Sequence, residues 1–424
     1  MKDLASRVAR RIWTSHRPIA MSRIPSAFDI VAREPSRRST GFGREAMESD
    51  RVSRAEHLLL ASYATHSRDT AGRAFPEPPH PYRGPFQRDR DRILHSSAFR
   101  RLSGKMQVFT GEMGEYHRTR LTHTFEVASI ARTITRVLQL NEDLTEALAL
   151  MHDIGHPPFG HCGEDVLNEC MASVGGFSHN AFALVIAQQL EQRYTGHPGL
   201  NLSAEVLEGQ TERADKHDGS VNASARLEVQ IVDIADSLAY DAHDVDDALQ
   251  MGLLSIDELS QLRIIRRAIE QITAKYGVLS NAKLRPALVH ELIDLQVSDF
   301  LDQATERLRR WGGCRSEELS EAGVRLAHSL ELGEERAEWE AYLFENVYRH
   351  PKLMSVRRHA ADRLQRLFDT LSSRPDRLPL RFRQRAESLG VVRGVGEYLA
   401  GMTDRFCDTQ YRFLVEGSGP LADW

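Results

Sequence analysis

Apolar residues recur at helical spacing through most of the chain beyond residue 120. The clearest stripe covers residues 121–140, where apolar side chains stand mostly three or four positions apart, as one face of a helix requires. Its members are Phe125, Val127, Ile130, Ala131, Ile134 and Leu138. The same spacing continues over residues 144–151, 182–190, 227–249, 259–272 and 337–413. No internal repeat or strand-rich region interrupts this pattern, so the sequence predicts an all-α protein.

Proline, glycine and polar residues mark where the helices stop. The proline-rich segment 74–82 is expected to be an extended lead-in, because proline lacks an amide donor and restricts the residue before it. Residues 196–222 are polar and contain glycine, which favours a loop or an insertion, and a further break is expected at 372–375. We therefore predict a compact catalytic core over residues 47–250, with a helical C-terminal extension over 251–424 packed on it.

Residues 1–46 differ from the rest of the chain, since they are poor in acids and show no sustained periodicity. Their arginines include Arg7, Arg10, Arg11, Arg37 and Arg38. We predict a disordered basic arm. Three alternatives stay open: a tail that contacts nucleic acid, a transit peptide, and a start placed too early, with initiation at Met21 or Met47.

The overall composition is ordinary for a soluble globular protein, with 41% hydrophobic and 27% charged residues. The four cysteines form no CxxC pair, so neither a disulfide framework nor a zinc ribbon is expected, and a reducing cytoplasm is the predicted location. No apolar run of roughly eighteen residues predicts a membrane-spanning helix. A net charge of −5 gives no general attraction to nucleic acid, so a phosphate-bearing ligand would need a locally basic site.

The dipeptide His152-Asp153 is the strongest chemical signal in the chain. It closes the apolar run 147–151 and opens a turn rich in Gly, Pro and His over residues 154–161. An imidazole and a carboxylate at the end of a buried helix can reach one metal ion if the backbone turns there. The dipeptides His217-Asp218 and His243-Asp244 lack this context, so we predict that the first pair binds the metal.

Two other segments offer the further ligands that a metal needs. His123 follows Arg120 by three residues, so a helix places an imidazole and a guanidinium on one face, which suits a phosphate held between a cation and a metal. Arg118 is expected on a solvated basic face. Asp236 lies among small and apolar residues and is therefore expected near the core. Burying a carboxylate there without a cation partner would cost on the order of several kcal/mol. Two His and two Asp ligands with open positions suit Mg²⁺, Mn²⁺, Fe²⁺ or Ni²⁺ better than a structural Zn²⁺.

A second group of titratable residues follows the turn. His161 and Glu164 are three residues apart, where a new helix would begin. A carboxylate beside an imidazole orients it and favours its protonated form. His156 and His179 complete the group, which predicts acid–base chemistry close to the metal.

Together these residues resemble the HD superfamily of metal-dependent phosphohydrolases, in which a His, a His-Asp pair and an Asp follow one another along the chain. The closer similarity is to the deoxyguanosine triphosphate triphosphohydrolase-like proteins. It is carried in colinear order by residues 86–95, 99–109, 118–123, 152–164, 175–180, 227–249 and 401–406. The resemblance extends from about residue 50 to about residue 415, which is far more specific than a dipeptide.

The resemblance implies hydrolysis of a deoxynucleoside triphosphate, with dGTP among the candidates, to the deoxynucleoside and tripolyphosphate. The implied metal ligands are His123, His152, Asp153 and Asp236. The implied acid–base residues are His161 with Glu164, helped by His156 or His179. The implied substrate contacts are Arg120 and Lys105 at the triphosphate, Tyr240 and Asp244 at the sugar 3′-hydroxyl, and Gln107 where a 2′-hydroxyl would collide. The family commonly forms ring-like oligomers, often hexamers, and some members are activated by nucleotides at separate sites.

Three positions depart from the family pattern: Ser237, Met106 and Cys162 stand where Asp, Thr and Ala are common. Ser237 would weaken the interactions that support Asp236 as a metal ligand. For Cys162 we favour a small packed thiol over an oxidation-sensitive one. Two other functions stay open. One is a phosphodiesterase or a guanosine-tetraphosphate hydrolase, which would share the metal core. The other is a non-hydrolytic sensor or a nucleic-acid binder with single-stranded DNA as its partner, and its direct support is the basic arm.

Overall fold

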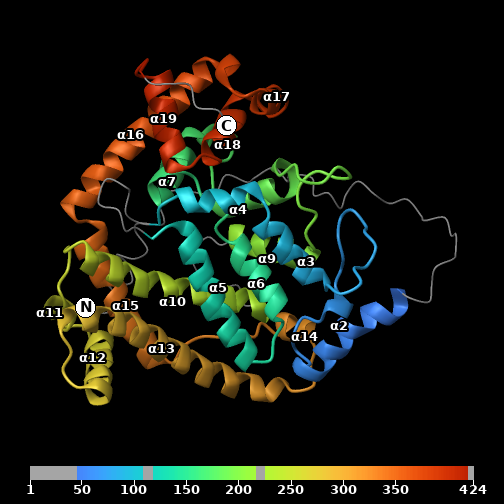
Figure 1. Cartoon of the computed structure of the whole chain (residues 1–424), viewed down its shortest axis with the longest axis vertical. Coiled ribbons are helices and arrows are strands. Elements are labelled where there is room, and N and C mark those ends of the chain that lie inside the picture. The colour runs from blue at the N-terminus through green and yellow to red at the C-terminus, as the bar shows by residue number, and fades with distance from the viewer. Residues whose placement is uncertain (1–44, 108–117, 216–224, 419–424) are drawn as a thin grey trace.

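In the computed structural model the protein is all-α, as its sequence predicts (Figure 1). The structure describes residues 45–107, 118–215 and 225–418. The first helices are α2 (Glu45–Leu59), α3 (Pro85–Leu94), α4 (Ser97–Arg101), α5 (Arg120–Val137), α6 (Glu142–Met151), α7 (Gly160–Cys170), α8 (His179–Val185), α9 (Ala204–Ala214) and α10 (Leu227–Gln250). They are followed by α11 (Ile256–Leu259), α12 (Arg263–Tyr276), α13 (Asn281–Leu308), α14 (Ser316–Glu321), α15 (Leu330–Leu343), α16 (Pro351–Ser373), α17 (Leu380–Leu389), α18 (Val391–Ala400) and α19 (Asp404–Leu414).

Helices α5 and α6 form because their starts are capped and one face of each is apolar. Thr119 and Asn141 are the N-caps, and their side-chain oxygens accept from backbone amides of the first turn at 3.3 and 3.2 Å. The apolar stripe predicted over 121–140 is buried with one exception. Phe125 is 49% exposed, because it lies on the outer face of α5, where its ring meets Phe99 edge-on at 5.8 Å between centroids.

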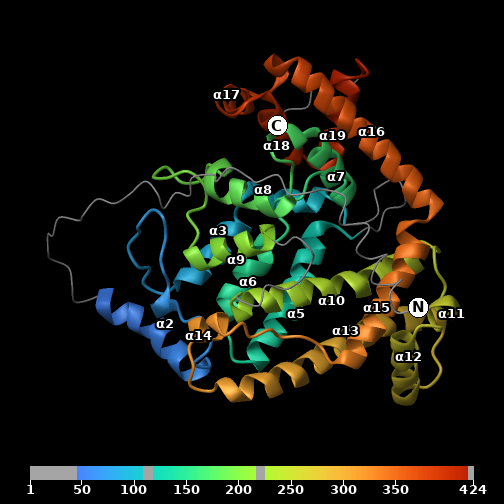
Figure 2. The same cartoon turned by 180° about the vertical axis from the view of Figure 1, so that it is seen from behind.

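The apolar side chains form two core clusters that meet along α10. The larger cluster joins α3, α5, α6 and the first part of α10 to the late helices α16 and α18. The smaller cluster surrounds Trp339 of α15 and joins the last part of α10 to α12 and α13. Figures 1 and 2 show α16 along one flank of the molecule, linking α15 to the group of α17, α18 and α19. The predicted boundary at residue 250 falls at the end of α10, and the division into core and extension stays a prediction.

The polar segment 196–222, predicted as a loop or an insertion, contains helix α9. Its polar side chains reach residues that are distant in sequence. Glu205 accepts from Thr70 Oγ1 at 2.8 Å, and Gln210 donates to Asn180 O at 3.1 Å. The prediction missed the helix because contacts of this kind leave no helical periodicity in the sequence.

The other predicted breaks lie close to those observed. Residues 74–82 contain no helix, and α16 ends at Ser373, inside the predicted break. The helix predicted from residue 259 begins at Arg263 as α12, after the separate short helix α11. Among the described residues no helix has the length and apolar character needed to cross a bilayer. The predicted arm over 1–46, except for its last two residues, lies outside the described residues, as does the 217–218 dipeptide.

Candidate metal centre and substrate pocket

The backbone turns sharply after α6 and thereby brings the HD dipeptide to the site. His152 is the C-cap of α6, and its Nδ1 is hydrogen-bonded with Ala149 O at 2.5 Å, which leaves Nε2 to face the site. Phe159, with a left-handed φ of 64°, precedes α7, and its amide donates to Asp404 Oδ1 at 2.9 Å. A carboxylate at the start of α19 therefore fixes the end of this turn.

Three of the predicted metal ligands lie together beside the turn. His123 Nε2 is 3.1 Å from Asp236 Oδ1, and His152 Nε2 is 3.7 Å from the same oxygen. Among the described residues, the buried His152 Nε2 has no hydrogen-bond partner. A buried nitrogen without a partner is costly, and two imidazoles with a carboxylate are a donor set that suits divalent metals. These residues therefore fit a metal ion.

Asp153 joins this group to a second set of histidines. Its Oδ1 is 3.5 Å from His152 Nε2 and 3.1 Å from His156 Nε2, and its Oδ2 accepts from Arg120 Nη1 at 3.0 Å. Burial opposes the ionisation of Asp153. His152 and Arg120 outweigh burial and hold the pKa of this carboxyl well below its usual range. The carboxylate is therefore ionised and available to a cation.

Arg213 of α9 is a site residue that the sequence reasoning missed. Its Nη2 donates to Asp236 Oδ2 at 3.0 Å, and its Nη1 donates to Asp233 at 2.5 Å. Burial opposes the ionisation of Asp236, but His152, His123 and Arg213 together hold its pKa far below the usual range. Arg213 thus provides a cation partner for Asp236, whose side chain is partly buried. No local signal marks it, because an arginine in a polar segment looks solvated.

The predicted acid–base residues surround Glu164 of α7. Its Oε1 is 2.7 Å from His179 Nδ1 and accepts from the His179 amide at 2.8 Å, while its Oε2 is 3.3 Å from His161 Nδ1. His156 stacks on His179 with 3.7 Å between ring centroids. Burial opposes the ionisation of Glu164, but His179 and His161 hold the pKa of its carboxyl well below the usual range. One carboxylate therefore orients two imidazoles, one of which, His161, has a half-exposed side chain.

Gly155 sets how closely this turn approaches α8. A Cβ at this position would overlap His179 O and lie 2.5 Å from Ala183 N. We expect Gly155→Ala to destabilise the protein by about 2–3 kcal/mol, because backbone cannot yield as a side chain can. Urea unfolding measures this change. Gly333→Ala is the matched control, since nothing lies within 4 Å of a Cβ there, and helix propensity predicts a gain of up to about 1 kcal/mol. Equal effects of the two variants would contradict the close approach.

Arg120 and Lys105 are both buried but use their charges differently. Arg120 Nε and Nη2 have no hydrogen-bond partner among the described residues, although Nη1 binds Asp153. Lys105 Nζ donates to His156 O and to Ala400 O, the latter at 3.1 Å. Burial, with Arg101 nearby, lowers the pKa of Lys105 well below its usual value. The phosphate contact of Lys105 stays a prediction, and its observed bonds fix the site backbone.

A small pocket that opens to solvent lies beside the histidine group, and several predicted substrate-binding residues line it. Its lining includes Gln107, His161 and Tyr240, together with Phe159 and Arg357. Gln107 Oε1 is buried and unpartnered among the described residues. Arg357, in α16, was not predicted from the sequence. It adds a cation to the pocket from a helix distant in sequence.

Cys162 lines this pocket, whereas Asp244 lies four residues beyond Tyr240 on α10 and is not part of the lining. Tyr348 donates its hydroxyl to Asp244 Oδ2, and Asp244 Oδ1 is buried without a partner among the described residues. Burial raises the pKa of the Cys162 thiol to about 11, and its Sγ donates to Arg357 O at 3.2 Å. Cys162 is therefore a protonated, packed thiol. Ser237 Oγ, by contrast, accepts from Arg336 Nη2 at 2.6 Å, away from the metal group.

Sequence comparisons agree with this geometry. A family model for the HD domain matches residues 120–241, which include every predicted metal ligand, and a model for a phosphohydrolase-associated domain matches residues 326–413. A deoxyguanosinetriphosphate triphosphohydrolase-like protein of Brucella anthropi is 41% identical over 390 residues, covering 85% of this chain and 97% of its own length. A protein of the same description from Geobacter sulfurreducens is 40% identical over 379 residues, covering 87% of this chain and 98% of its own. The chain therefore belongs to the deoxyguanosinetriphosphate triphosphohydrolase-like proteins, which are metal-dependent phosphohydrolases of the HD family.

Proposed function

We propose that the protein hydrolyses deoxynucleoside triphosphates to the deoxynucleoside and tripolyphosphate. The observation that carries the proposal is the continuity of the site through Asp153. This carboxylate contacts His152 of the metal group, His156 of the acid–base group and the buried Arg120. A phosphate placed there would lie within reach of a metal, a cation and a proton donor, which is what phosphoester hydrolysis needs.

In this proposal His123, His152, Asp153 and Asp236 hold one divalent ion. Mg²⁺ or Mn²⁺ is proposed first, with Fe²⁺ or Ni²⁺ as alternatives, because the mixed imidazole and carboxylate set accepts all four. A divalent ion held there would supply Lewis-acid stabilisation of the charge on the phosphate. Arg213 keeps Asp236 ionised and oriented, as partners of metal-binding carboxylates generally do.

Arg120 is proposed to grip the triphosphate. Its unpartnered Nε and Nη2 are held in place by the bond from Nη1 to Asp153, so the guanidinium is already oriented for an oxyanion. Gly160 leaves room for it, since a Cβ there would lie 3.0 Å from Arg120 Nη2. We propose that Arg357 adds a second positive charge at the pocket wall, with Lys105 as a further candidate.

His161 is proposed as the proton donor to the departing 5′-oxygen of the nucleoside. Its half-exposed side chain lines the pocket, and its Nδ1 faces Glu164, so Nε2 is turned away from the carboxylate. Glu164 is a positioning residue in this scheme, because its two oxygens orient His161 and His179. His156, stacked on His179, completes the group and helps to hold it together.

The sugar is proposed to lie between Gln107 and Tyr240. Both side chains line the small pocket, so a 2′-hydroxyl would meet Gln107 there, which favours deoxyribose. Tyr240 and Asp244 are proposed to bind the 3′-hydroxyl. Asp244 Oδ1 is buried and has no partner within the described ranges, which supports this role because a buried acceptor requires a donor.

Glu164→Gln tests the proposed proton donor while preserving the shape of the side chain. The amide cannot accept from both imidazoles as the carboxylate does, so we expect kcat to fall roughly 10- to 100-fold while KM changes little. Glu169→Gln, on the exposed face of the same helix, is the control, and its kinetics should match those of the wild type. An unchanged kcat in Glu164→Gln would remove Glu164 from the proposed proton-donor group.

A substrate panel tests the reaction itself. The purified protein is incubated in Mn²⁺ or Mg²⁺ with each of the four dNTPs, with GTP, and with cyclic and tetraphosphate guanosine nucleotides, and products are separated by ion-pair chromatography. Deoxynucleoside with tripolyphosphate is the expected pair, and the preferred base follows from the same panel. Monophosphate with pyrophosphate would place cleavage at a different bond. Turnover of cyclic or tetraphosphate nucleotides alone would indicate a phosphodiesterase or guanosine-tetraphosphate hydrolase, and binding without turnover would indicate a sensor.

Three partner predictions accompany this proposal: homo-oligomerisation, activation by a second nucleotide, and binding of single-stranded DNA by the basic arm. Light scattering after size-exclusion chromatography measures the first. Assays in paired dNTPs measure the second. DNA binding that disappears when residues 1–46 are deleted would assign it to the arm.

A further inference from the structure

The turn between α18 and α19 contacts two segments of the candidate site through one carboxylate. Asp404 is the first residue of α19, and both of its oxygens accept from backbone amides that are distant in sequence. Oδ1 accepts from Phe159 N at 2.9 Å, and Oδ2 accepts from Met106 N at 3.1 Å. Residues 401–406 are one of the segments that carry the family resemblance, and the proposed reaction so far gives them no part.

The first of these segments carries two of the proposed substrate contacts. Residues 105–107 lie antiparallel to residues 118–120, and Arg120 N donates to Lys105 O at 2.9 Å. A bond to the amide in the middle of this strip therefore fixes Gln107, which follows directly, and the start of the helix that bears Arg120. Lys105 strengthens the same contact, because its Nζ donates to the last carbonyl of α18 at 3.1 Å.

The second segment forms the opposite wall of the sugar pocket. Phe159 lines this pocket together with Gln107 and His161. Its φ of 64° is unfavourable for a bulky side chain, and such a conformation persists where the surroundings hold it. The two walls approach closely at Gly160, since a Cβ there would lie 3.1 Å from Gln107 O. The carboxylate that binds both segments therefore sets the separation of the two walls.

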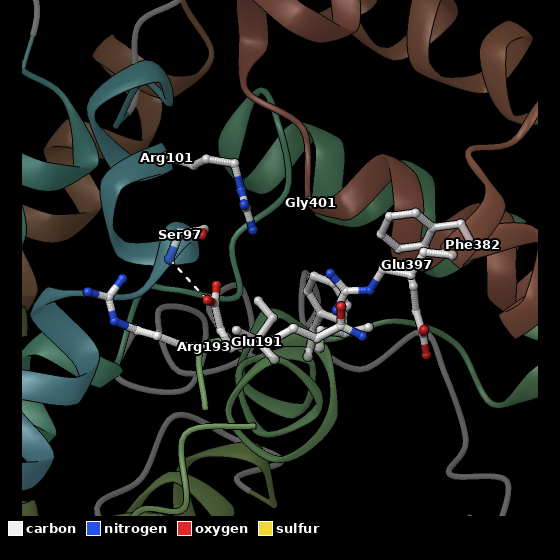
Figure 3. A pocket seen from close by; sticks show the side chains of 12 residues that line it. Ser97, Arg101, Glu191, Arg193, Phe382, Glu397 and Gly401 are labelled. Carbon is white, nitrogen blue, oxygen red and sulfur yellow. Dashed lines mark hydrogen bonds between the residues drawn. The ribbon is translucent and has the colours of Figure 1, made fainter. Parts of the chain in front are cut away.

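The contact also joins the regions that the two family models match. The carboxylate lies in the phosphohydrolase-associated region, residues 326–413, whereas Phe159 lies in the HD domain, residues 120–241. On another side of the turn, Gly401 and Arg101 of α4 line a pocket that opens to solvent (Figure 3). Because the turn borders an open pocket there, its position depends more strongly on its polar contacts with the site.

We propose that Asp404 is a positioning residue for the selection of deoxyribose. It holds Met106 and Phe159 at a fixed separation and thereby keeps the sugar pocket too narrow for a 2′-hydroxyl. The C-terminal region thus takes part in the choice of substrate. This inference rests on the proposed hydrolysis and deepens it, because it concerns which nucleotides the same site accepts.

Asp404→Asn tests the proposal while preserving the shape of the side chain. The amide can accept from only one of the two backbone groups, because its nitrogen is a donor, so one wall of the pocket is released. We expect the preference for dNTPs over NTPs, measured as the ratio of their kcat/KM values for each base, to fall roughly tenfold. Asp257→Asn is the matched control, because Asp257 is an exposed aspartate in the first turn of α11. It makes the same change of charge at the start of a helix, and its ratio should equal that of the wild type.

Gly104→Ala tests the same contact from the other side without removing a polar group. A Cβ at Gly104 would lie 2.9 Å from Thr403 Cγ2, so it should push the turn away from the strip. We expect the preference for dNTPs to fall roughly two- to fivefold. Hydrogen exchange, measured by mass spectrometry on peptides that contain Met106 or Phe159, should be faster than in the wild type in both variants.

Thermal unfolding separates this role from general destabilisation. If Asp404→Asn is less stable but keeps the wild-type ratio, or if exchange at both amides is unchanged, the proposal is overturned. If the wild type hydrolyses no dNTP, the proposed reaction fails, and the dissociation constants of dNTPs and NTPs then replace the kinetic ratio. Equal binding of the two classes by the wild type, or binding of neither, would overturn this inference as well.

Discussion

His152→Ala should abolish hydrolysis, with a loss of kcat on the order of 1,000-fold or more. The variant removes the imidazole whose buried Nε2, beside Asp236 and Asp153, has no hydrogen-bond partner in the described part of the chain. Loss of a residue that merely supports a metal ligand typically costs roughly 10- to 100-fold, and loss of a ligand itself should cost more. The metal content of the purified variant should fall in parallel, which elemental analysis measures.

Two further variants make the test specific. His290→Ala, on the exposed surface of α13, should retain both activity and metal. Asp153→Asn changes the charge of the neighbouring ligand with little change in shape, so it should lose metal and activity. Its thermal stability should also fall, because the buried Arg120 loses its ionised partner. If His152→Ala keeps its metal yet loses activity, His152 acts in some other way than as a ligand. If it keeps both, the predicted metal centre is wrong.

Site residues could be predicted from the sequence where the neighbouring residues indicate their role. His152 and Asp153 close an apolar helix and open a turn rich in glycine, and His123 is placed by helical spacing. The structure brings His123, His152 and Asp236 within 4.8 Å of one another, and it brings Asp153, His156 and His179 together in the same way. Spacing along the chain could anticipate this proximity because short helices and a tight turn restrict the geometry.

Residues that reach the site from distant helices could not be found in this way. Arg213 lies in a helix that the sequence reasoning took for a loop, and Arg357 lies in α16, more than a hundred residues after the last predicted metal ligand. An arginine in a polar stretch is usually solvated, and only packing decides otherwise. Phe125 shows the converse error. It matched the apolar pattern, yet it lies on the outer face of α5.

Arg120→Gln should lower kcat/KM roughly 100- to 1,000-fold, the range found when a preorganised donor to a developing negative charge is removed. The physical reason is that the guanidinium is held in one orientation while two of its nitrogens lack a partner among the described residues. Nη1 is fixed by Asp153 at 3.0 Å, while Nε and Nη2 are buried with no hydrogen-bond partner among the described residues. Such donors are oriented before the substrate arrives, so no reorganisation opposes binding of the triphosphate. Steady-state kinetics with the preferred dNTP measure the loss.

Arg120→Lys separates geometry from charge. A lysine keeps the positive charge beside Asp153 but cannot present the planar fork, so it should recover only a small part of the activity. Arg132→Gln, on the same helix, is the control, because its ion pairs with Glu142 and Glu146 are long, at 3.5 and 3.8 Å, and partly exposed. It should have wild-type kinetics. Full activity in Arg120→Lys would mean that charge alone matters there, and full activity in Arg120→Gln would remove Arg120 from the proposed triphosphate site.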